Sequence, residues 1–437
     1  MNKKSALGLL VAITLAACSG GGSIPTTQSL TPQAVTPPTS DGGSPLAAAL
    51  NYKQSCDTPT MPGEMSCHAL VRTDIGGAPN AIVRVHVDAS TAPSGYGPAQ
   101  LQAAYALAAA AASNGAGQTV ALIESGDYPT AQADLNTYRS QYGLPACGSG
   151  CFEKVSQTGS TTSLPKENAS WAEESALDMD MVSAVCPKCH ILMVEATSSS
   201  NANLGAATKE AATLGATEIS NSYGGGESGS SNADYAYSNI VVTASSGDSG
   251  YAGGVEQPCS YSTVVCTGGS SLKTASNSRG YSETVWNDLS SDNGAASSGC
   301  SAEVTKPSWQ TDKGCTKRSE SDVSFSADPE NGVAVYDSTS YEGYVGWLEF
   351  GGTSVASPAI ASVYALAGNA SSLGENAAKT IWNNAGTGLW SVTSGNNLSG
   401  RTKCGSAYPY ICTAGTGDDG VYSGPTGWGT PDGLTDF

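Results

Sequence analysis

The sequence predicts an α/β fold in which a central, mostly parallel sheet is flanked by helices. Short, continuous apolar runs recur along the chain, and stretches with helical patterning separate them. Strands that are apolar throughout are typical of parallel sheets covered by helices on both faces. The chain has 437 residues, which is enough for one large domain or two smaller ones.

The regular alternation of strands and helices begins near residue 95. The expected strands are TVALIE (119–124), ILMVEA (191–196), TEISNS (217–222) and IVVTAS (240–245). The expected helices cover 99–112, 130–141, 171–185, 202–213 and the apolar run that begins near Pro358. Short strands that alternate with longer helices predict crossover connections between parallel strands.

Charged residues are scarce in this chain. They make up 13% of the residues, against roughly 25% in ordinary globular proteins. The formal net charge is -19, so we do not expect nucleic acid to bind through a basic surface. A surface short of Lys and Arg gains little repulsion when its carboxylates take up protons, so the composition suits an acidic medium.

The N-terminus resembles an export signal. Two lysines precede an apolar run over 6–17, which is too short to span a bilayer as a mature helix. Leu15-Ala16-Ala17-Cys18 resembles a bacterial lipobox, so we expect lipid attachment at Cys18 and membrane anchoring at the outer membrane or cell surface. The alternatives are a plain cleaved signal and a cysteine that stands there by chance.

Four segments are expected. Residues 1–17 are the signal peptide, and 18–45, rich in Gly, Ser, Thr and Pro, form a flexible tether. Residues 46–95 are a short segment too small for an independent domain, and 96–437 form the main domain.

Twelve cysteines remain after Cys18, and they fall into close neighbours in the sequence. In an exported protein the simplest interpretation is six local disulfides, although sequence alone does not fix the pairing. One pair, Cys186-Pro-Lys-Cys189-His190, also matches the attachment motif of c-type haem. We expect a disulfide and no haem, because the motif lies between a helix and a strand with no evident space for the cofactor. Zinc is not expected, since no second ligand pair lies near.

A nucleophile is expected in GGTSVASPAIASVYALAG (351–368). Its two glycines allow a tight turn, and Pro358 fits the first turn of the helix that follows. Ser354 is therefore expected at a helix N-terminus, where backbone N–H groups favour a developing oxyanion. The alternative is a serine that only caps the helix.

Carboxylates are the better candidates for its base. The three histidines, His68, His86 and His190, are more typical of structural positions. Glu174 and Asp178 lie one turn apart on an apolar helix, about 40° from each other around its axis. Two partly buried carboxyls in contact do not both ionise easily, so they share a proton. The alternative is two acids on a solvated helix face.

Asp248 is a candidate oxyanion donor. It follows the expected strand 240–245, at the carboxyl end where sites of parallel sheets form. A protonated Asp in an apolar site can donate a hydrogen bond to an oxyanion. The alternative is an ordinary turn residue.

These three segments resemble motifs of the sedolisin (serine-carboxyl peptidase) family, acid-acting relatives of subtilisin that include kumamolisin. Trp-Ala-x-Glu-x-x-Leu-Asp is matched at 171–178, Ser-Gly-Asp-Ser-Gly at 246–250 and Gly-Gly-Thr-Ser-x-x-x-Pro at 351–358. The order and spacing of the three motifs also agree with the family pattern, and the resemblance covers roughly residues 95–437. The resemblance implies a subtilisin-like fold, with Ser354 as nucleophile, Glu174 as base, Asp178 orienting that base and Asp248 completing the oxyanion hole.

The resemblance also implies a role for Glu124 in ALIESG, as a group that extends the proton-sharing chain behind Asp178. The neighbouring Glu173 is expected to face solvent. Ordinary subtilisin chemistry is disfavoured, because the histidine motif is missing and Asp248 stands where subtilisins use Asn.

Two departures from the family pattern concern activation and calcium. Family members have a large N-terminal prodomain, whereas about 75 residues separate Cys18 from the catalytic region here. The family's calcium site needs two Asp, but Ser391 stands where one is expected, and Asp419 or Ser423 stands at the other. If calcium binds here, Gly417 and Asp419 are the expected positions. We expect a weaker site than the family's, because calcium takes six to eight oxygen ligands and one or two carboxylates are replaced.

The predicted function is that of a lipid-anchored, secreted, monomeric acid endopeptidase that acts on polypeptide substrates. One alternative is a surface-anchored binding or adhesion protein built on an inactive peptidase scaffold. A c-type cytochrome is the least favoured alternative.

Overall fold

The computed structural model describes residues 52–75, 93–148, 150–291, 294–384, 387–400, 402–417 and 420–437. All of them belong to one compact unit, Ala49–Phe437. The expected signal peptide, Cys18 and the tether lie outside the described residues, as does His86. Among the described helices, none has the length and apolar character needed to cross a membrane.

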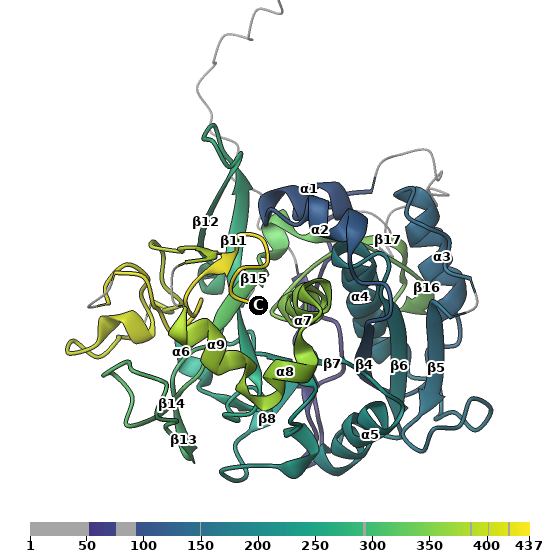
Figure 1. Ribbon diagram of the computed structural model, residues 1–437, viewed down its shortest axis with the longest axis horizontal. Helices are drawn as coiled ribbons and strands as arrows, with labels where there is room; N and C mark the ends of the chain where they lie inside the picture. Colours follow the sequence, from purple (N-terminus) through teal and green to yellow (C-terminus); the bar gives the residue numbers. More distant parts are fainter. Residues whose placement is uncertain are drawn as a thin grey trace, which may run out of the picture. The chain divides into compact units, whose positions relative to one another are not determined.

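The core of this unit is a sheet in which every pairing but one is parallel (Figure 1). The exception is the antiparallel pair of β11 and β12. In spatial order the strands are β12 (Tyr281–Val285), β11 (Val265–Thr274), β9 (Val241–Ser245), β7 (Glu218–Asn221), β4 (Thr119–Ser125), β6 (His190–Ala196) and β5 (Phe152–Ser156), and β15 (Val323–Ser326) also pairs with β11. The predicted α/β fold is confirmed.

Helices cover both faces of the sheet. α5 (Asn201–Thr213) packs on β4, β6 and β7, while α4 (Ala169–Val185) and α7 (Ala356–Ala367) lie against each other on the opposite face (Figure 1). Successive side chains of β4 point to opposite faces of the sheet, which explains the two layers. Val120 and Leu122 pack in the hydrophobic cluster that includes residues of α4 and α7. Ala121 and Ile123 pack in the cluster that includes residues of α5.

The expected strands are all present, but one expected helix is broken. The segment predicted as a single helix over 99–112 forms α1 (Pro98–Ala104) and α2 (Ala108–Ser113). Ala106 between them has a left-handed backbone with φ of 55°, which a continuous right-handed helix does not permit. α3 (Ala131–Gln141) forms as predicted.

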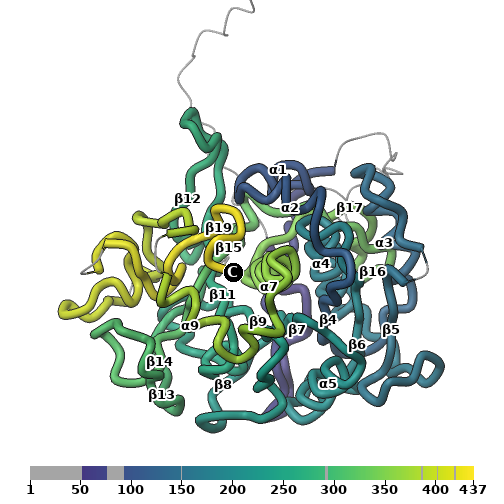
Figure 2. Tube along the Cα trace, in the orientation of Figure 1, coloured from purple at the N-terminus to yellow at the C-terminus, as the bar shows by residue number. Residues whose placement is uncertain are grey.

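The short N-terminal segment is built into the same unit. β1 (Tyr52–Gln54) pairs with β3 (Leu70–Arg72), and β3 pairs with β17 (Tyr344–Gly351), the second strand of a hairpin with β16 (Val333–Tyr341). β2 (Ser66–Cys67) pairs with β8 (Tyr223–Gly226). Figure 2 shows this segment in purple, running next to α7.

The remaining elements are short. They are α6 (Gly250–Gly253), α8 (Ala370–Leu373), α9 (Ala377–Asn383), β10 (Glu256–Gln257), β13 (Cys300–Thr305), β14 (Lys317–Ser319), β18 (Leu389–Trp390) and β19 (Thr430–Pro431).

The six predicted local disulfides are confirmed. They join Cys56 to Cys67, Cys147 to Cys151, Cys186 to Cys189, Cys259 to Cys266, Cys300 to Cys315 and Cys404 to Cys412. The Cys-x-x-Cys-His motif is therefore a small disulfide loop that links the end of α4 to β6, as expected from its position.

Candidate active site

The site lies at the carboxyl edge of the central sheet, where loops that follow several parallel strands meet. Glu124 is at the end of β4, Ser222 directly follows β7, and Asp248 is in the loop after β9. α4 contributes Glu174 and Asp178 from the adjoining helical layer. The asparagine cap of this helix fixes its start, since the Asn168 side chain accepts a hydrogen bond from the N–H of Trp171.

Glu174, Asp178 and Glu124 form a fully buried chain of carboxyls. Burial raises the pKa of Asp178 to about 8, although hydrogen bonding to Ser222, Glu124 and Glu174 lowers it. Burial, followed by the charge of Asp178, raises the pKa values of Glu174 and Glu124 well above their usual range. The three groups cannot all ionise together, so they hold shared protons.

Ser222 anchors this chain of carboxyls. Its hydroxyl lies 2.8 Å from each carboxylate oxygen of Asp178. Its backbone carbonyl accepts a hydrogen bond of 3.1 Å from the hydroxyl of Ser354. One residue therefore connects the Asp178 carboxyl to the serine that the sequence selects as nucleophile.

Ser354 lies in the turn between β17 and α7, two residues before the helix begins. Gly352 in this turn has a φ of 96°, a conformation that glycine adopts without strain. Ser354 lowers the pKa of the Glu174 carboxyl, a smaller effect than burial, but neither Glu174 oxygen has a hydrogen bond of normal geometry within the described part of the chain. Both side chains are completely buried.

Asp248 lies beside the same turn. Its Oδ1 accepts hydrogen bonds of 2.8 Å from both the backbone N–H and the hydroxyl of Thr353. Its Oδ2 is buried and has no hydrogen-bond partner in the described part of the chain. Burial raises the pKa of Asp248 to about 6, against the lowering effects of the His68 charge and the Thr353 hydrogen bonds. The free oxygen can therefore carry a proton in mild acid.

The structure thus brings together Ser354, Glu174, Asp178, Asp248 and Glu124, but the expectation for Glu173 was wrong. Its side chain is buried rather than exposed to solvent. Ser55 donates a hydrogen bond of 3.0 Å to Glu173 Oε2, and Lys53 lies 3.5 Å from the same oxygen. The N-terminal segment covers this side of α4, which the helix pattern alone does not reveal.

Three further residues at the site were missed from the sequence: Ser222, His68 and Glu256. Ser222 had a usable signal, because it ends an expected strand at the carboxyl edge of the sheet. His68 and Glu256 had none. They are 188 residues apart in the sequence, yet His68 Nε2 lies 3.0 Å from Glu256 Oε2.

The region expected to hold calcium does not supply a calcium site from its described residues. Gly417 lines a cavity of about 260 Å³ in which Asp312 is the only carboxylate among the described lining residues. Asp312 is already paired with Lys306 at 2.8 Å, and the Ser423 hydroxyl is 2.7 Å from that of Thr426. Asp419 lies outside the described residues. Calcium takes six to eight oxygens, and the described side chains of this region contribute one carboxylate to the cavity, which already has a partner.

A serine paired with buried carboxyls on a subtilisin-like fold is the arrangement of the serine-carboxyl peptidases, and comparisons confirm the resemblance to this class. The chain is a homologue of sedolisin from Pseudomonas sp. (strain 101), with 29% identity over 371 residues. The match covers 77% of this chain and 60% of that protein, so the chain spans less than two thirds of its curated relative.

A solved structure supports the same relationship. Pseudomonas sedolisin, a serine-carboxyl proteinase complexed with two molecules of pseudo-iodotyrostatin, is similar with a TM-score of 0.63 and 26% identity. The similarity covers 78% of this chain and 96% of that one. No family model matches the chain.

Proposed function

We propose that this chain is an acid-acting serine endopeptidase of the sedolisin type. The observation that carries the proposal is the link of Ser354 to a buried chain of carboxyls through Ser222. The Ser354 hydroxyl donates to the Ser222 carbonyl, and the Ser222 hydroxyl donates to Asp178. A serine needs a neighbouring base to become a nucleophile, and a carboxylate in this environment can serve as that base. The homology to sedolisin supports the same reaction class.

The chemistry follows from the contacts of each group. Ser354 Oγ attacks the carbonyl carbon of the substrate while Glu174 takes its proton. Asp178, held by Ser222, orients Glu174 and shares the proton, and Glu124 extends this sharing further. The Ser354 backbone N–H and the protonated Oδ2 of Asp248 stabilise the oxyanion of the tetrahedral intermediate.

The protonation of Asp248 places the reaction in acid. Asp248 must be protonated to donate, and its pKa is about 6. Loss of this proton therefore sets the alkaline limit of activity. The coupled carboxyls share their protons, and one of them must ionise to accept the proton of Ser354.

The test is hydrolysis of an unstructured protein from pH 2 to 8. We expect cleavage in acid that disappears in Ser354→Ala and Glu174→Gln. Glu173→Gln is the matched control, because Glu173 is the adjacent buried carboxyl and has Ser55 and Lys53 as partners instead of Ser354. A folded wild-type chain without activity at any pH would favour the alternative, a binding protein on an inactive scaffold.

We also propose that the enzyme is exported, anchored through a lipid on Cys18, and monomeric. Support comes from the lipobox-like sequence at 15–18 and the apolar run before it. Expression of wild type and Cys18→Ser, followed by separation of membranes from soluble protein, tests the anchor. Calcium at Gly417 and Asp419 likewise remains a prediction.

A further inference from the structure

Thr353 stands directly before the proposed nucleophile, in the turn between β17 and α7, and it is completely buried. A threonine at the start of a helix often caps it, with its hydroxyl accepting from the first N–H groups. In α7 the cap position belongs to Val355, which makes no such bond. The Thr353 hydroxyl instead contacts Asp248, in the loop after β9. The start of the helix therefore does not explain the hydroxyl of Thr353.

The direction of the hydrogen bonds around this hydroxyl is fixed. The N–H of Gly247, which can only donate, lies 3.0 Å from Thr353 Oγ1. The hydroxyl hydrogen is then directed to Asp248 Oδ1 at 2.8 Å, and the backbone N–H of Thr353 donates to the same oxygen at 2.8 Å. Two donors thus occupy Oδ1, so it is the poorer place for the proton of this carboxyl. The proton is directed to Oδ2.

Asp248 Oδ2 is the oxygen that faces the reaction. It is buried and has no hydrogen-bond partner in the described part of the chain. A side chain on Gly352 would come within 2.7 Å of Oδ2 and 2.1 Å of the His68 carbonyl oxygen. That carbonyl accepts a hydrogen bond of 3.0 Å from the Ser354 N–H. Oδ2 and the acceptor of the Ser354 N–H therefore lie on one face of Gly352, where the oxyanion is expected.

The methyl group of Thr353 holds the hydroxyl in this orientation. A side chain on Gly269 of β11 would meet this methyl carbon at 3.3 Å, next to the side chains of Ala296 and Ala327. Branched side chains are stiff about their first torsion angle, so the packed methyl group also fixes the direction of the hydroxyl. Thr353 is therefore held by packing on one side and by the Gly247 N–H on the other.

Three titratable groups face Asp248: His68, Glu256 and Glu174. Burial raises the pKa of Asp248 to about 6, and the His68 charge and the two Thr353 hydrogen bonds lower it, while the Glu256 charge raises it. The charge of Asp248 in turn raises the pKa of Glu174. Thr353 is thus the uncharged group that favours the ionised form of Asp248.

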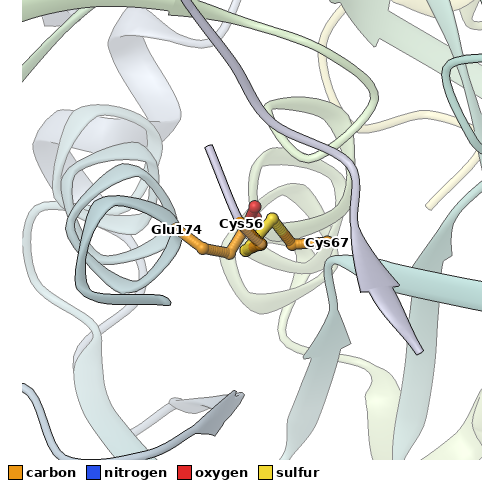
Figure 3. Close-up of side chains that lie close together, drawn as sticks. All are labelled: Cys56, Cys67 and Glu174. Carbon is orange, nitrogen blue, oxygen red and sulfur yellow. A yellow bond between two sulfur atoms is a disulfide. The ribbon is translucent and has the colours of Figure 1, made fainter. Parts of the chain in front are cut away.

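The surroundings of these groups are dry. On the α4 side, Glu174 lies beside the disulfide of Cys56 and Cys67, and all three residues are buried (Figure 3). Both sulfurs and a carboxylate oxygen of Glu174 lie within 4.8 Å of one another. Hydrogen bonds in such surroundings have a larger effect on a carboxyl than they have in water.

We propose that Thr353 is a positioning residue for the oxyanion, because it holds Asp248 Oδ1 as an acceptor and so directs the proton of this carboxyl to Oδ2. This inference rests on the proposed peptidase function. The same hydroxyl stabilises the ionised carboxylate, so it also lowers the pH at which the proton is lost. The contact that aims the donor therefore narrows the pH range in which the donor is present.

The first experiment compares profiles of kcat against pH, measured on an unstructured protein. Thr353→Val keeps the shape of the side chain and removes the hydroxyl. We expect kcat to fall about 10-fold or more, because the donor on Asp248 is no longer aimed, and the alkaline limb to move up by about one pH unit. Thr353→Ser keeps the hydroxyl, so its alkaline limb should stay with that of the wild type.

The matched control is Thr267→Val. Thr267 is a buried threonine of β11 whose hydroxyl donates to the Ala244 carbonyl at 2.9 Å. This variant should lose stability and keep the alkaline limb of the wild type. If Thr353→Val does not fold, Thr353→Ala lacks the same hydroxyl and should show the same limb. An unmoved limb without the hydroxyl would overturn the inference and leave the peptidase standing, whereas a folded wild type without activity would overturn the proposed function itself.

The second experiment repeats the change in Asp248→Asn, where residue 248 has no proton to lose. Adding Thr353→Val there should leave the alkaline limb in place and still lower kcat, because the amide also depends on this contact for its orientation. A merely structural role of Thr353 would move the limb equally with and without the Asp248 carboxyl. Equal shifts would therefore overturn the assignment.

Discussion

The backbone N–H of Ser354 donates a hydrogen bond of 3.0 Å to the carbonyl oxygen of His68, 286 residues earlier in the chain. The same carbonyl lies next to Asp248 along the face of Gly352. The proposed oxyanion hole is therefore occupied by a peptide group. Its two donors differ in kind, since the N–H of Ser354 is permanent whereas the donor on Asp248 exists only when that carboxyl is protonated.

Asp248→Asn should replace the pH-dependent donor by one that is present at every pH, and leave the Ser354 N–H unchanged. An amide can still accept from Thr353 and donate toward the oxyanion, but it does not titrate near pH 6 as Asp248 does. We expect activity to persist further toward neutral pH than in the wild type. Asp248→Ala, which lacks the donor, should lose about 10²–10³ in kcat. Profiles of kcat against pH check both, and an unchanged alkaline limb in the Asn variant would contradict the role of Asp248.

Ser222→Ala should disturb the proton-sharing chain. Its hydroxyl donates to Asp178 and lowers the pKa of that buried carboxyl. Without it the pKa of Asp178 rises, so the acid limb of the activity profile should move to higher pH. We also expect a loss of about 1–3 kcal/mol in unfolding free energy, because a buried carboxyl loses a partner.

The control for this variant is Ser220→Ala. Ser220 is buried in β7 and its hydroxyl lies 2.8 Å from that of Ser357, not from a carboxyl. The Ser220→Ala variant should be less stable than the wild type, but its profile of activity against pH should not shift. Equal shifts in the two variants would argue against a specific role for Ser222.

Glu218→Gln should stabilise the protein at neutral pH. Burial raises the pKa of Glu218 to about 8, from an unperturbed value of 4.5. Between these values the folded state binds more protons than the unfolded state, so the stability contributed by the protonated form falls as pH rises. Replacement by a neutral amide should restore roughly 1–3 kcal/mol at pH 8 and change little at pH 4.

Denaturant unfolding at the two pH values measures this effect. Glu218 lies at the opposite end of β7 from Ser222, so the catalytic pH profile should not change. A variant that is equally stabilised at pH 4 and pH 8 would mean that packing, and not proton binding, is responsible.

Calcium should stabilise the chain only weakly. Asp312, the described carboxylate that lines the cavity beside Gly417, is already paired with Lys306. With a Kd near 1 mM, about 1 mM calcium would add roughly 0.4 kcal/mol and raise Tm by about 0.5 °C. Thermal unfolding with calcium and with a chelator checks this, and Asp419→Asn should abolish any difference. A shift of many degrees would show that a well-formed site exists.

The sheet and the four principal site residues were predictable because their signals are local. Each strand is a continuous apolar run, and Glu174 and Asp178 lie on one helix at a fixed spacing. Asp248 and Ser354 each stand in a glycine-containing turn directly after a strand. Their joint placement then follows from the carboxyl edge of a parallel sheet.

The missed features depend on contacts between distant segments. Glu173 is buried because Ser55 reaches α4 from the N-terminal segment, and nothing in the helix pattern encodes that contact. The break at Ala106 goes against the helix propensity of this alanine-rich segment, so the local sequence does not predict it. The side-chain contacts of His68 join the end of β2 to Ser245 of β9 and Glu256 of β10, so no single stretch of sequence contains them.

The contact between His68 and Ser354 joins positions 286 residues apart in the sequence. Contacts between such distant segments carry a large entropy cost of loop closure and form slowly. The turn that holds Ser354 should therefore be completed late in folding, after the local elements of the sheet have formed.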